Sequence, residues 1–375
     1  MANLTEEQSM LRDAAKAWVA EKSPVTAFRK MRDSGNTDGF DRGVWKEMCE
    51  MGWAGILVPE DLGGSGLDYL TMGLVLEETG RTLTASPLFT TALVATSALL
   101  LAGNDAQKKE WLPKFASGDA LGTLAVDEAA HHAPEQITLK ATKSGSGWTL
   151  SGKKVFVLDG GAADVLIVAA RANGKPGDKD GITLFLVPGG AKGLKRTKLK
   201  SVDSRGVANL EFDNVAAEVL GSVDHGFSTL EAILDRARAG MAAEMLGQAS
   251  QSFDITLEYL KTRTQFGQVI GTFQALQHRA AKMFTDLELA RSCVEAALIA
   301  IDRGANDVPQ LVSLAKTRAG DVCHLVSNEM VQMHGGIGMT DAHDSGLYLK
   351  RARVQEATYG GSSFHRDRYA TLMGY

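Results

Sequence analysis

The sequence is poor in cysteine and has no long apolar run, and each shortage excludes a class of protein. Its 3 cysteines (Cys49, Cys293 and Cys323) are odd in number and widely spaced, which fits free thiols in a reducing compartment. Cys323 precedes His324, but without further ligand spacing we expect no metal site. No stretch has the apolar length that spans a bilayer. The acidic, amphipathic first residues read as neither a signal nor a transit peptide, so we expect a cytoplasmic protein.

An excess of positive charge is also missing. The formal net charge is -5, and no block of lysine and arginine marks a nucleic-acid surface, so we expect no nucleic-acid partner. The densest basic run, residues 192 to 200 (KGLKRTKLK), is interpreted as a solvated face in preference to an anion site. With 44% hydrophobic and 23% charged residues, the chain has the composition of an ordinary globular protein.

The hydrophobic patterns divide the chain into three segments. Residues 1–118 are expected to be helical, with Thr5 and Gln8 forming a capping box ahead of the first helix. Residues 119–223 carry short β-type runs between glycine- and aspartate-rich turns, which predicts a β-barrel-like domain. Residues 224–375 return to long helical periods that suit a four-helix bundle. The predicted class is a multidomain α+β protein.

Several local motifs occur in a fixed order along this framework. They are residues 58 to 66 (VPEDLGGSG), Trp148 followed by Gly152 and Lys153, residues 263 to 267 (RTQFG) with Phe273 and Gln274, and residues 332 to 338 (QMHGGIG). Each is weak alone, but their joint order resembles the acyl-CoA dehydrogenase family over nearly the whole chain. The glycines of the last motif follow a helix and lie outside any βαβ unit, so they are no Rossmann fingerprint and imply no NAD.

The resemblance implies an FAD cofactor and an acyl-CoA substrate. An arginine fork and exposed backbone N–H groups suit the pyrophosphate of FAD. The residues implied in cofactor binding are Arg263, Thr264, Gln265, Phe266, Gln274, Gln332, Gly335 and Gly336, and those implied in substrate binding are Asp235 and Arg238. For Phe266 and Phe273, burial statistics favour packing in the core over contact with the dinucleotide.

The family's catalytic base is absent from its usual positions. In typical members a glutamate in a Tyr-Glu-Gly-Thr segment removes the α-proton of the thioester, and here that position is Gly360. Some members place the glutamate on an earlier helix, at a position that matches Ala237. Glu244 lies about 10 Å further along that helix, too far to replace the base. Asp235 and Glu356 lie nearer to the two usual positions and are possible substitutes. No residue is assigned as catalytic.

The segments that resemble the family's flavin-ring pocket have also changed. Residues 125 to 134 (AVDEAAHHAP) lack the hydroxyl donors of the family's Thr-Glu-Pro and Gly-Ser-Asp segments. The family's Trp-Ile-Thr triplet is Phe156-Val157-Leu158, without the threonine. In this family one subunit surrounds the flavin ring while its neighbour contacts the ADP portion. The chain therefore keeps the residues given to a neighbour and has lost those used for its own flavin.

The leading hypothesis is a partner chain of an α2β2 acyl-CoA dehydrogenase that acts on bulky, steroid-derived acyl-CoA. A paralogous subunit would supply the glutamate, and an electron-transfer flavoprotein would accept the electrons. The alternative is a homo-oligomeric FAD protein of the same fold with other chemistry, using Asp127, His131 or His132, although a solvated loop is favoured for both histidines. A scaffold that binds no flavin is a third possibility, which Arg263 and the Gly335–Gly336 pair argue against.

Overall fold

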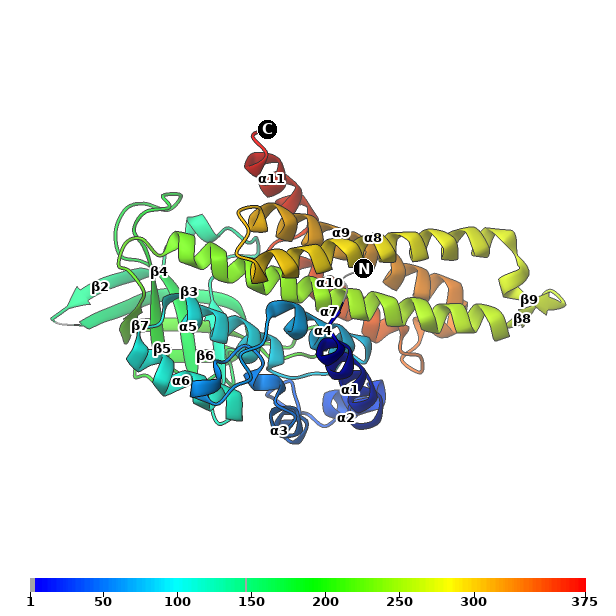
Figure 1. Cartoon of the computed structure of the whole chain (residues 1–375), viewed down its shortest axis with the longest axis horizontal. Coiled ribbons are helices and arrows are strands. Elements are labelled where there is room, and N and C mark those ends of the chain that lie inside the picture. Colours follow the sequence, from blue (N-terminus) through cyan, green and yellow to red (C-terminus); the bar gives the residue numbers. More distant parts are fainter. Residues whose placement is uncertain (1–3, 146) are drawn as a thin grey trace. The chain divides into compact units, whose positions relative to one another are not determined.

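The computed structural model describes residues 4–145 and 147–375, and these form two compact units. Of the described residues, one unit contains 30–68, 85–145 and 147–237, and the other contains 4–29, 69–84 and 238–375. The helical, β, helical order predicted along the chain is confirmed (Figure 1). The amino-terminal helices do not form a unit of their own, however, because they are divided between the two. The predicted boundaries after residues 118 and 223 stay predictions.

The β unit is built around a closed sheet. Its strands are β1 (Gly122–Ala125), β2 (Lys140–Ser144), β3 (Gly147–Leu158), β4 (Val165–Arg171), β5 (Ile182–Pro188), β6 (Leu194–Lys198) and β7 (Val207–Leu220). They follow the order β1-β4-β2-β3-β7-β5, β6 pairs with β7, and a β4–β5 pairing closes the path into a barrel. Every residue of β4 is buried, in keeping with the apolar run of residues 165 to 170 that precedes Arg171.

Helices complete the β unit. They are α3 (Arg42–Glu50), α5 (Thr96–Ala102), α6 (Asp105–Ser117), a buried π-helix at Leu88–Ala95, and the first part of α7 (Phe227–Thr262). The α6 helix starts with a capping box in which Asn104 and Gln107 exchange side-chain and backbone hydrogen bonds. Gln107 then reaches the last strand, because its Nε2 donates to the carbonyl oxygen of Val219 at 2.9 Å.

The helical unit contains α1 (Glu6–Lys22), α4 (Tyr69–Arg81), the remainder of α7, α8 (Gln274–Asp302), α9 (Val308–His334), α10 (Ser345–Ala357) and α11 (Ser362–Leu372). The α2 helix (Val25–Asp33) begins in this unit. The capping box predicted at Thr5 and Gln8 is confirmed, with both hydrogen bonds at 3.1 Å. A short hairpin, β8 (Thr264–Gln265) and β9 (Gln268–Val269), joins α7 to α8 at one end of the long helices (Figure 1). None of the described helices is long and apolar enough to cross a membrane.

Two glycines let α4 and α7 approach backbone to backbone within the helical unit. A Cβ placed on Gly80 would lie 2.2 Å from the carbonyl oxygen of Glu244, and one on Gly247 would lie 1.8 Å from that of Glu77. Backbone cannot move aside as a flexible side chain can, so a methyl group at either position must separate the helices.

We expect Gly247→Ala to destabilise the chain by about 1–3 kcal/mol, the usual cost of overpacking a close contact. Urea unfolding followed by circular dichroism measures the change. Gly346→Ala is the matched control, since Gly346 lies in α10 with nothing within 4 Å of its added Cβ. Equal stability of the two variants would show that the α4–α7 contact tolerates a methyl group.

Candidate functional site

Two of the cofactor motifs meet where α7 and α9 end. The hydroxyl of Tyr259 donates to the carbonyl oxygen of His334 at 3.4 Å, and the two rings stack with centroids 4.3 Å apart. His334 is buried and its Nδ1 donates to the carbonyl oxygen of Met330 at 2.6 Å. Arg263 follows Tyr259 by one helical turn and Gly335 follows His334 directly, so this contact brings the two motifs together.

The residues expected to bind the cofactor are accessible at this junction. Arg263, Gln274, Gln332, Gly335 and Gly336 are all exposed. Gly335 has a φ of 63°, which favours glycine, and neither it nor Gly336 has any atom within 4 Å of an added Cβ. The space that a side chain at Gly335 or Gly336 would occupy is therefore empty, and the backbone there can be approached closely. Open backbone beside an exposed guanidinium fits a pyrophosphate group, so these residues fit the ADP portion of FAD.

Phe266 lies at the tip of the β8–β9 hairpin. It has a φ of 54°, followed by Gly267 at 77°, as in a tight hairpin turn. Its side chain is 89% exposed, and it contacts the ring of Phe273 edge-on with centroids 6.1 Å apart. The expectation that Phe266 packs in the core is wrong, because the turn projects its ring away from the unit. An exposed ring on a constrained turn is typical of a contact residue.

The position of the family's catalytic glutamate is occupied by other side chains. Gly360 has a φ of 106°, and a Cβ there would lie 2.4 Å from Cδ1 of Phe364 and 3.0 Å from Nε2 of His365. The guanidinium of Arg238 lies 5.4 Å from the Phe364 ring centroid, and its Nε donates to the carbonyl oxygen of Tyr359 at 3.2 Å. The loss of the glutamate is thus accompanied by packing that fills its place.

The alternative base position and the implied substrate residues are buried on α7. Ala237 and Arg238 are 0% exposed, and Asp235 is 2% exposed. The role of Asp235 and Arg238 in binding acyl-CoA stays a prediction.

The other carboxylates considered as substitute bases are held in ion pairs. Glu244 accepts a hydrogen bond from Arg351 at 2.8 Å, and both side chains are buried. Glu356 accepts from Arg353 at 2.6 Å and lies 3.0 Å from Nδ1 of His324. Neither carboxylate is left without a cationic partner. In the described part of the chain, no cluster of histidine, cysteine, aspartate and glutamate has the make-up of a metal site.

Lys316, which the sequence analysis did not single out, holds the loop that carries Gly360. Its side chain is buried, and Nζ donates to the carbonyl oxygens of Gln355, Glu356 and Gly360 at 3.0–3.1 Å. Three acceptors match the three donors of an ammonium group. Burial, reinforced by the charge of Arg238, nevertheless lowers the pKa of Lys316 to about 7.

This lowered pKa predicts a pH-dependent contribution to stability. Between pH 7 and about 10.4, the ordinary lysine pKa, the unfolded chain binds a proton that the folded chain has lost, so stability from this group rises with pH. We expect the unfolding free energy of the wild type, relative to Lys316→Met, to rise by up to about 1.4 kcal/mol per pH unit in this window. Urea titrations at pH 7, 8 and 9.5 measure it, with exposed Lys350→Met as control. A flat difference would mean that the three carbonyls keep the ammonium charged.

The altered loop of the β unit contains an imidazole–carboxylate pair. Nδ1 of His132 lies 2.7 Å from Oδ1 of Asp127, and the His132 side chain is only 3% exposed. His131 is exposed. The solvated-loop interpretation is therefore wrong for His132, because Asp127 draws its ring into the loop. A carboxylate on Nδ1 fixes the tautomer of the ring, as in general-base pairs.

A buried lysine anchors the same loop. Nζ of Lys154, with a 0% exposed side chain, donates to Glu128 Oε1 and to the carbonyl oxygen of Val126, both at 2.8 Å. Burial raises the pKa of Glu128, but Lys154 and hydrogen bonds from Thr138 and Leu139 outweigh this and keep the pKa low. The motif lysine, Lys153, is exposed instead. Burial along β3 does not alternate regularly, because the pairing with β7 shifts register on both sides of Lys154, so no sequence pattern marked this lysine as buried.

The segment in place of the Trp-Ile-Thr triplet presents an exposed ring. Phe156 is 59% exposed with a φ of 52°, and its backbone N–H donates to Asn209 Oδ1 at 3.2 Å. The backbone carbonyl of Leu158 is satisfied by the hydroxyl of Thr123 at 2.6 Å. Leu158 itself supplies no polar group, so the hydroxyl that the family places there is missing.

The three parts of the chain match three domain models of one family. Residues 5–119 match "Acyl-CoA dehydrogenase, N-terminal domain", residues 128–215 the middle domain and residues 224–373 the C-terminal domain. The chain is 33% identical to an acyl-CoA dehydrogenase of Bacillus subtilis over 97% of each chain.

Two solved structures resemble the whole chain. A variant of the Tcur3481-Tcur3483 steroid ACAD has 31% identity and a TM-score of 0.90, covering 98% of both chains. A chain of the ChsE4-ChsE5 complex from Mycobacterium tuberculosis has 26% identity and a TM-score of 0.90, covering 100% of both.

Proposed function

Because this chain belongs to the acyl-CoA dehydrogenase family, whose members are FAD flavoproteins, we propose that it is the partner chain of an α2β2 acyl-CoA dehydrogenase. In this proposal a paralogous subunit carries the catalytic glutamate. The substrate is a bulky, steroid-derived acyl-CoA that is oxidised between its α and β carbons.

The packing around Gly360 carries the proposal. A chain that had lost only its base would leave a cavity the size of a carboxylate, whereas here Phe364 and His365 fill the place of the added Cβ. Both remaining carboxylates of the helical unit that were considered as bases, Glu244 and Glu356, are held by arginines. A chain without the family's glutamate, and without room for it at residue 360, is suited to assisting another subunit's reaction.

The exposed residues that fit the ADP portion of FAD would give this chain its role, which is to help hold the flavin. Arg263 and the backbone of Gly335 and Gly336 would hold the pyrophosphate of the flavin that the paralogue surrounds. FAD, when bound, supplies the acceptor for the β-hydride. Phe266, on its constrained turn, would pack against the partner or the dinucleotide and exclude water from the charged contact. An electron-transfer flavoprotein is the proposed acceptor of the electrons.

The relatives support an assembly of paired chains. Two of the solved structures that this chain resembles bear names that pair two proteins, and one of these names also specifies a steroid enzyme. Both likenesses extend over almost the whole chain at a TM-score of 0.90.

Reconstitution tests the proposal. The chain and a paralogue that carries the glutamate, taken from the neighbouring reading frames, are purified separately and then mixed. We expect neither chain alone to oxidise a steroid side-chain acyl-CoA, and the mixture to hold FAD and turn over. Normal turnover by this chain alone would refute the proposal. Butyryl-CoA, assayed in parallel, shows whether a short acyl-CoA is also oxidised.

The Asp127–His132 pair favours a second candidate, a homo-oligomeric FAD protein with other chemistry. A histidine held by a carboxylate can act as a general base where the family's glutamate is missing. A yellow homotetramer that keeps one flavin per chain would support this candidate. His132→Gln would then lower its turnover, whereas in the α2β2 enzyme the same change would leave turnover intact.

A further inference from the structure

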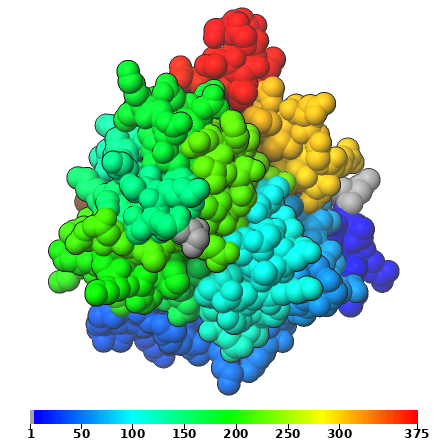
Figure 2. All heavy atoms as spheres, turned by 90° about the vertical axis from the view of Figure 1, so that its left-hand side faces the viewer, coloured from blue at the N-terminus to red at the C-terminus, as the bar shows by residue number. Residues whose placement is uncertain are grey.

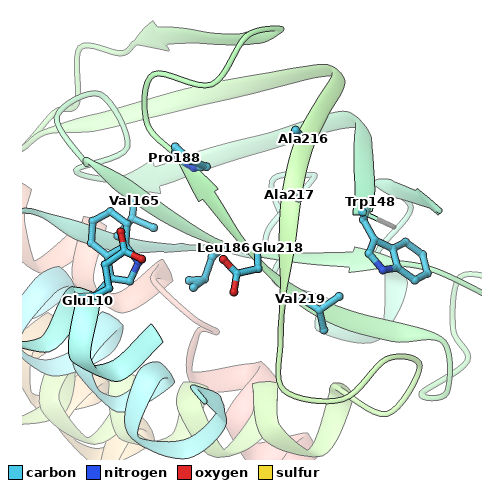
Figure 3. Close-up of a pocket in the computed structure, with 11 residues that line it drawn as sticks. Glu110, Trp148, Val165, Leu186, Pro188, Ala216, Ala217, Glu218 and Val219 are labelled. Carbon is cyan, nitrogen blue, oxygen red and sulfur yellow. The ribbon is translucent and has the colours of Figure 1, made fainter. Parts of the chain in front are cut away.

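None of the residues that line a groove in the β unit has been assigned a role in holding FAD or acyl-CoA, although Trp148, which begins one of the sequence motifs, is among them. The groove has a volume of about 540 Å³ and is lined by α6 and by strands of the barrel (Figure 3). Figure 2 shows the face of this unit on which α6, in cyan, lies beside the green residues of the later strands. The volume is within the range of sites that bind ligands of drug or short-peptide size.

The groove forms where two strands stop pairing. On the edge of β7 away from β3, β6 pairs with residues 208 to 212 and β5 pairs with Glu218 to Leu220. Residues 215 to 217 lie between these ladders and pair with no described strand on that edge, whereas Asn214 before them has a φ of 50° and donates its N–H to Ser151 Oγ. Ala216 and Ala217 belong to this gap and line the groove. An unpaired stretch of strand is a template for an extended chain, which would add its own hydrogen bonds there.

The groove has an apolar floor and aromatic ends. Leu186, Pro188 and Val219 line it, and Trp148 stands at one end, packed on Phe185 with centroids 5.6 Å apart (Figure 3). Trp111 lines it from α6, and Lys114 Nζ lies 4.7 Å from the centroid of that ring. The contact with Lys114 shows that the ring already accepts a cation.

The charged groups that line the groove are carboxylates. Glu110 and Glu218 are its ionisable lining residues, and both are exposed. Gln107 Nε2 donates to Oε1 of Glu218 at 2.6 Å and so fixes the direction of that carboxylate. Lys114 lies 3.7 Å from Glu110 and partly offsets its charge. The groove as a whole therefore attracts positive charge.

We propose that this groove binds an extended, basic peptide segment of a partner protein. The segment would pair with the open edge of β7 at residues 215 to 217. Alternate side chains would point to opposite faces, so its lysines or arginines would meet Glu110 and Glu218 on the face that Glu218 shares with its pair Leu186, while its apolar residues would cover Val219 and Trp148 on the other face. This proposal is independent of the proposed function, because none of these residues takes part in holding FAD or acyl-CoA.

Three capped peptides test the proposal on the full chain by isothermal titration calorimetry. The first is Gly-Val-Lys-Val-Lys-Val-Gly, the second has glutamates in place of the lysines, and the third has proline in place of the central valine. We expect the basic peptide to bind at least about fivefold more tightly than the acidic one, with an advantage that shrinks in high salt. The proline peptide is expected to lose binding because it cannot complete the strand pairing.

Variants of the chain locate the site. Ala216→Trp, at an exposed position of the groove, should abolish binding of the basic peptide while circular dichroism shows an unchanged fold. Glu218→Gln should weaken binding by about 1.5- to 5-fold, the range of one exposed ion pair. Glu211→Gln is the matched control, since it lies on the same strand and pairs with Lys195 outside the groove.

Four outcomes would overturn the proposal. They are no binding of the basic peptide, equal binding of the basic and acidic peptides, equal binding of the proline peptide, and unchanged binding by Ala216→Trp. If Ala216→Trp instead changed the oligomeric state in size-exclusion chromatography, the groove would be an interface with a second copy of the chain. The peptide proposal would then also fail.

Discussion

Gly360→Glu, which returns a carboxylate to the position of the family's base, is expected to give no acyl-CoA dehydrogenase activity and a less stable chain. A positioned general base contributes about 10²- to 10⁴-fold to rate, so a chain lacking only its base would gain a readily measured activity. Here the new Cβ would lie 2.4 Å from Phe364, and the φ of 106° is unsuited to any side chain. Backbone strain of this kind costs about 1–3 kcal/mol before the clash is counted.

The loss of the flavin-ring contacts strengthens this expectation. Leu158 has no hydroxyl to offer, and residues 125 to 134 contain none either, so a restored carboxylate would have no oriented flavin to work with. The assay measures reduction of an electron acceptor by steroid side-chain acyl-CoA with added FAD, beside urea unfolding. Gly361→Glu is the control for stability, because its nearest atom to an added Cβ is at an ordinary 3.8 Å. A gain of 10²-fold or more from Gly360→Glu would show that the base alone is missing.

Arg263→Ala in this chain should release FAD from the assembled complex, although the flavin ring belongs to the paralogue. A charge-assisted hydrogen bond to phosphate is worth about 1.5–3 kcal/mol, which corresponds to a roughly 10- to 150-fold weaker dissociation constant. Flavin fluorescence after dilution measures the release. Arg263→Lys should fall between wild type and alanine, because lysine keeps the charge and loses the planar fork.

The control for this experiment is Arg303→Ala, an exposed arginine of the same unit outside the junction of α7 and α9. It should leave FAD retention unchanged. If the complex holds FAD equally well after Arg263→Ala, this chain does not contribute to FAD binding in its partner's site. The reconstitution experiment would then still decide whether the two subunits pair.

Features set by neighbouring residues were predictable from the sequence. The capping box of Thr5 and Gln8, the helical periods and the β-type runs depend on contacts within a few residues, and they gave the correct order of elements. The glycines of the 332 to 338 motif were also informative, because Gly335 adopts the φ of 63° that favours glycine.

Features set by distant residues were not predictable. Arg238 contacts Tyr359 across 121 positions, and no pattern along the chain shows that this arginine is buried. His132 was assigned to solvent because its loop is polar, yet Asp127 holds it inside. Burial statistics placed Phe266 in the core because they ignore the turn that exposes it. In each case a single partner or backbone angle overrode an average tendency.

The packing of Phe364 over Gly360 also bears on how this protein can evolve. A glycine codon lies one nucleotide from a glutamate codon for GGA and GGG, so mutation offers the ancestral base again and again. Each such mutant meets Phe364 and an unfavourable backbone angle, and its carrier would lose fold stability without gaining a reaction. A return to independent catalysis needs Phe364 and the loop to change first, each without benefit by itself. In the proposed α2β2 enzyme, the side chain that fills this position would therefore work as a ratchet that keeps the gene dependent on its paralogue.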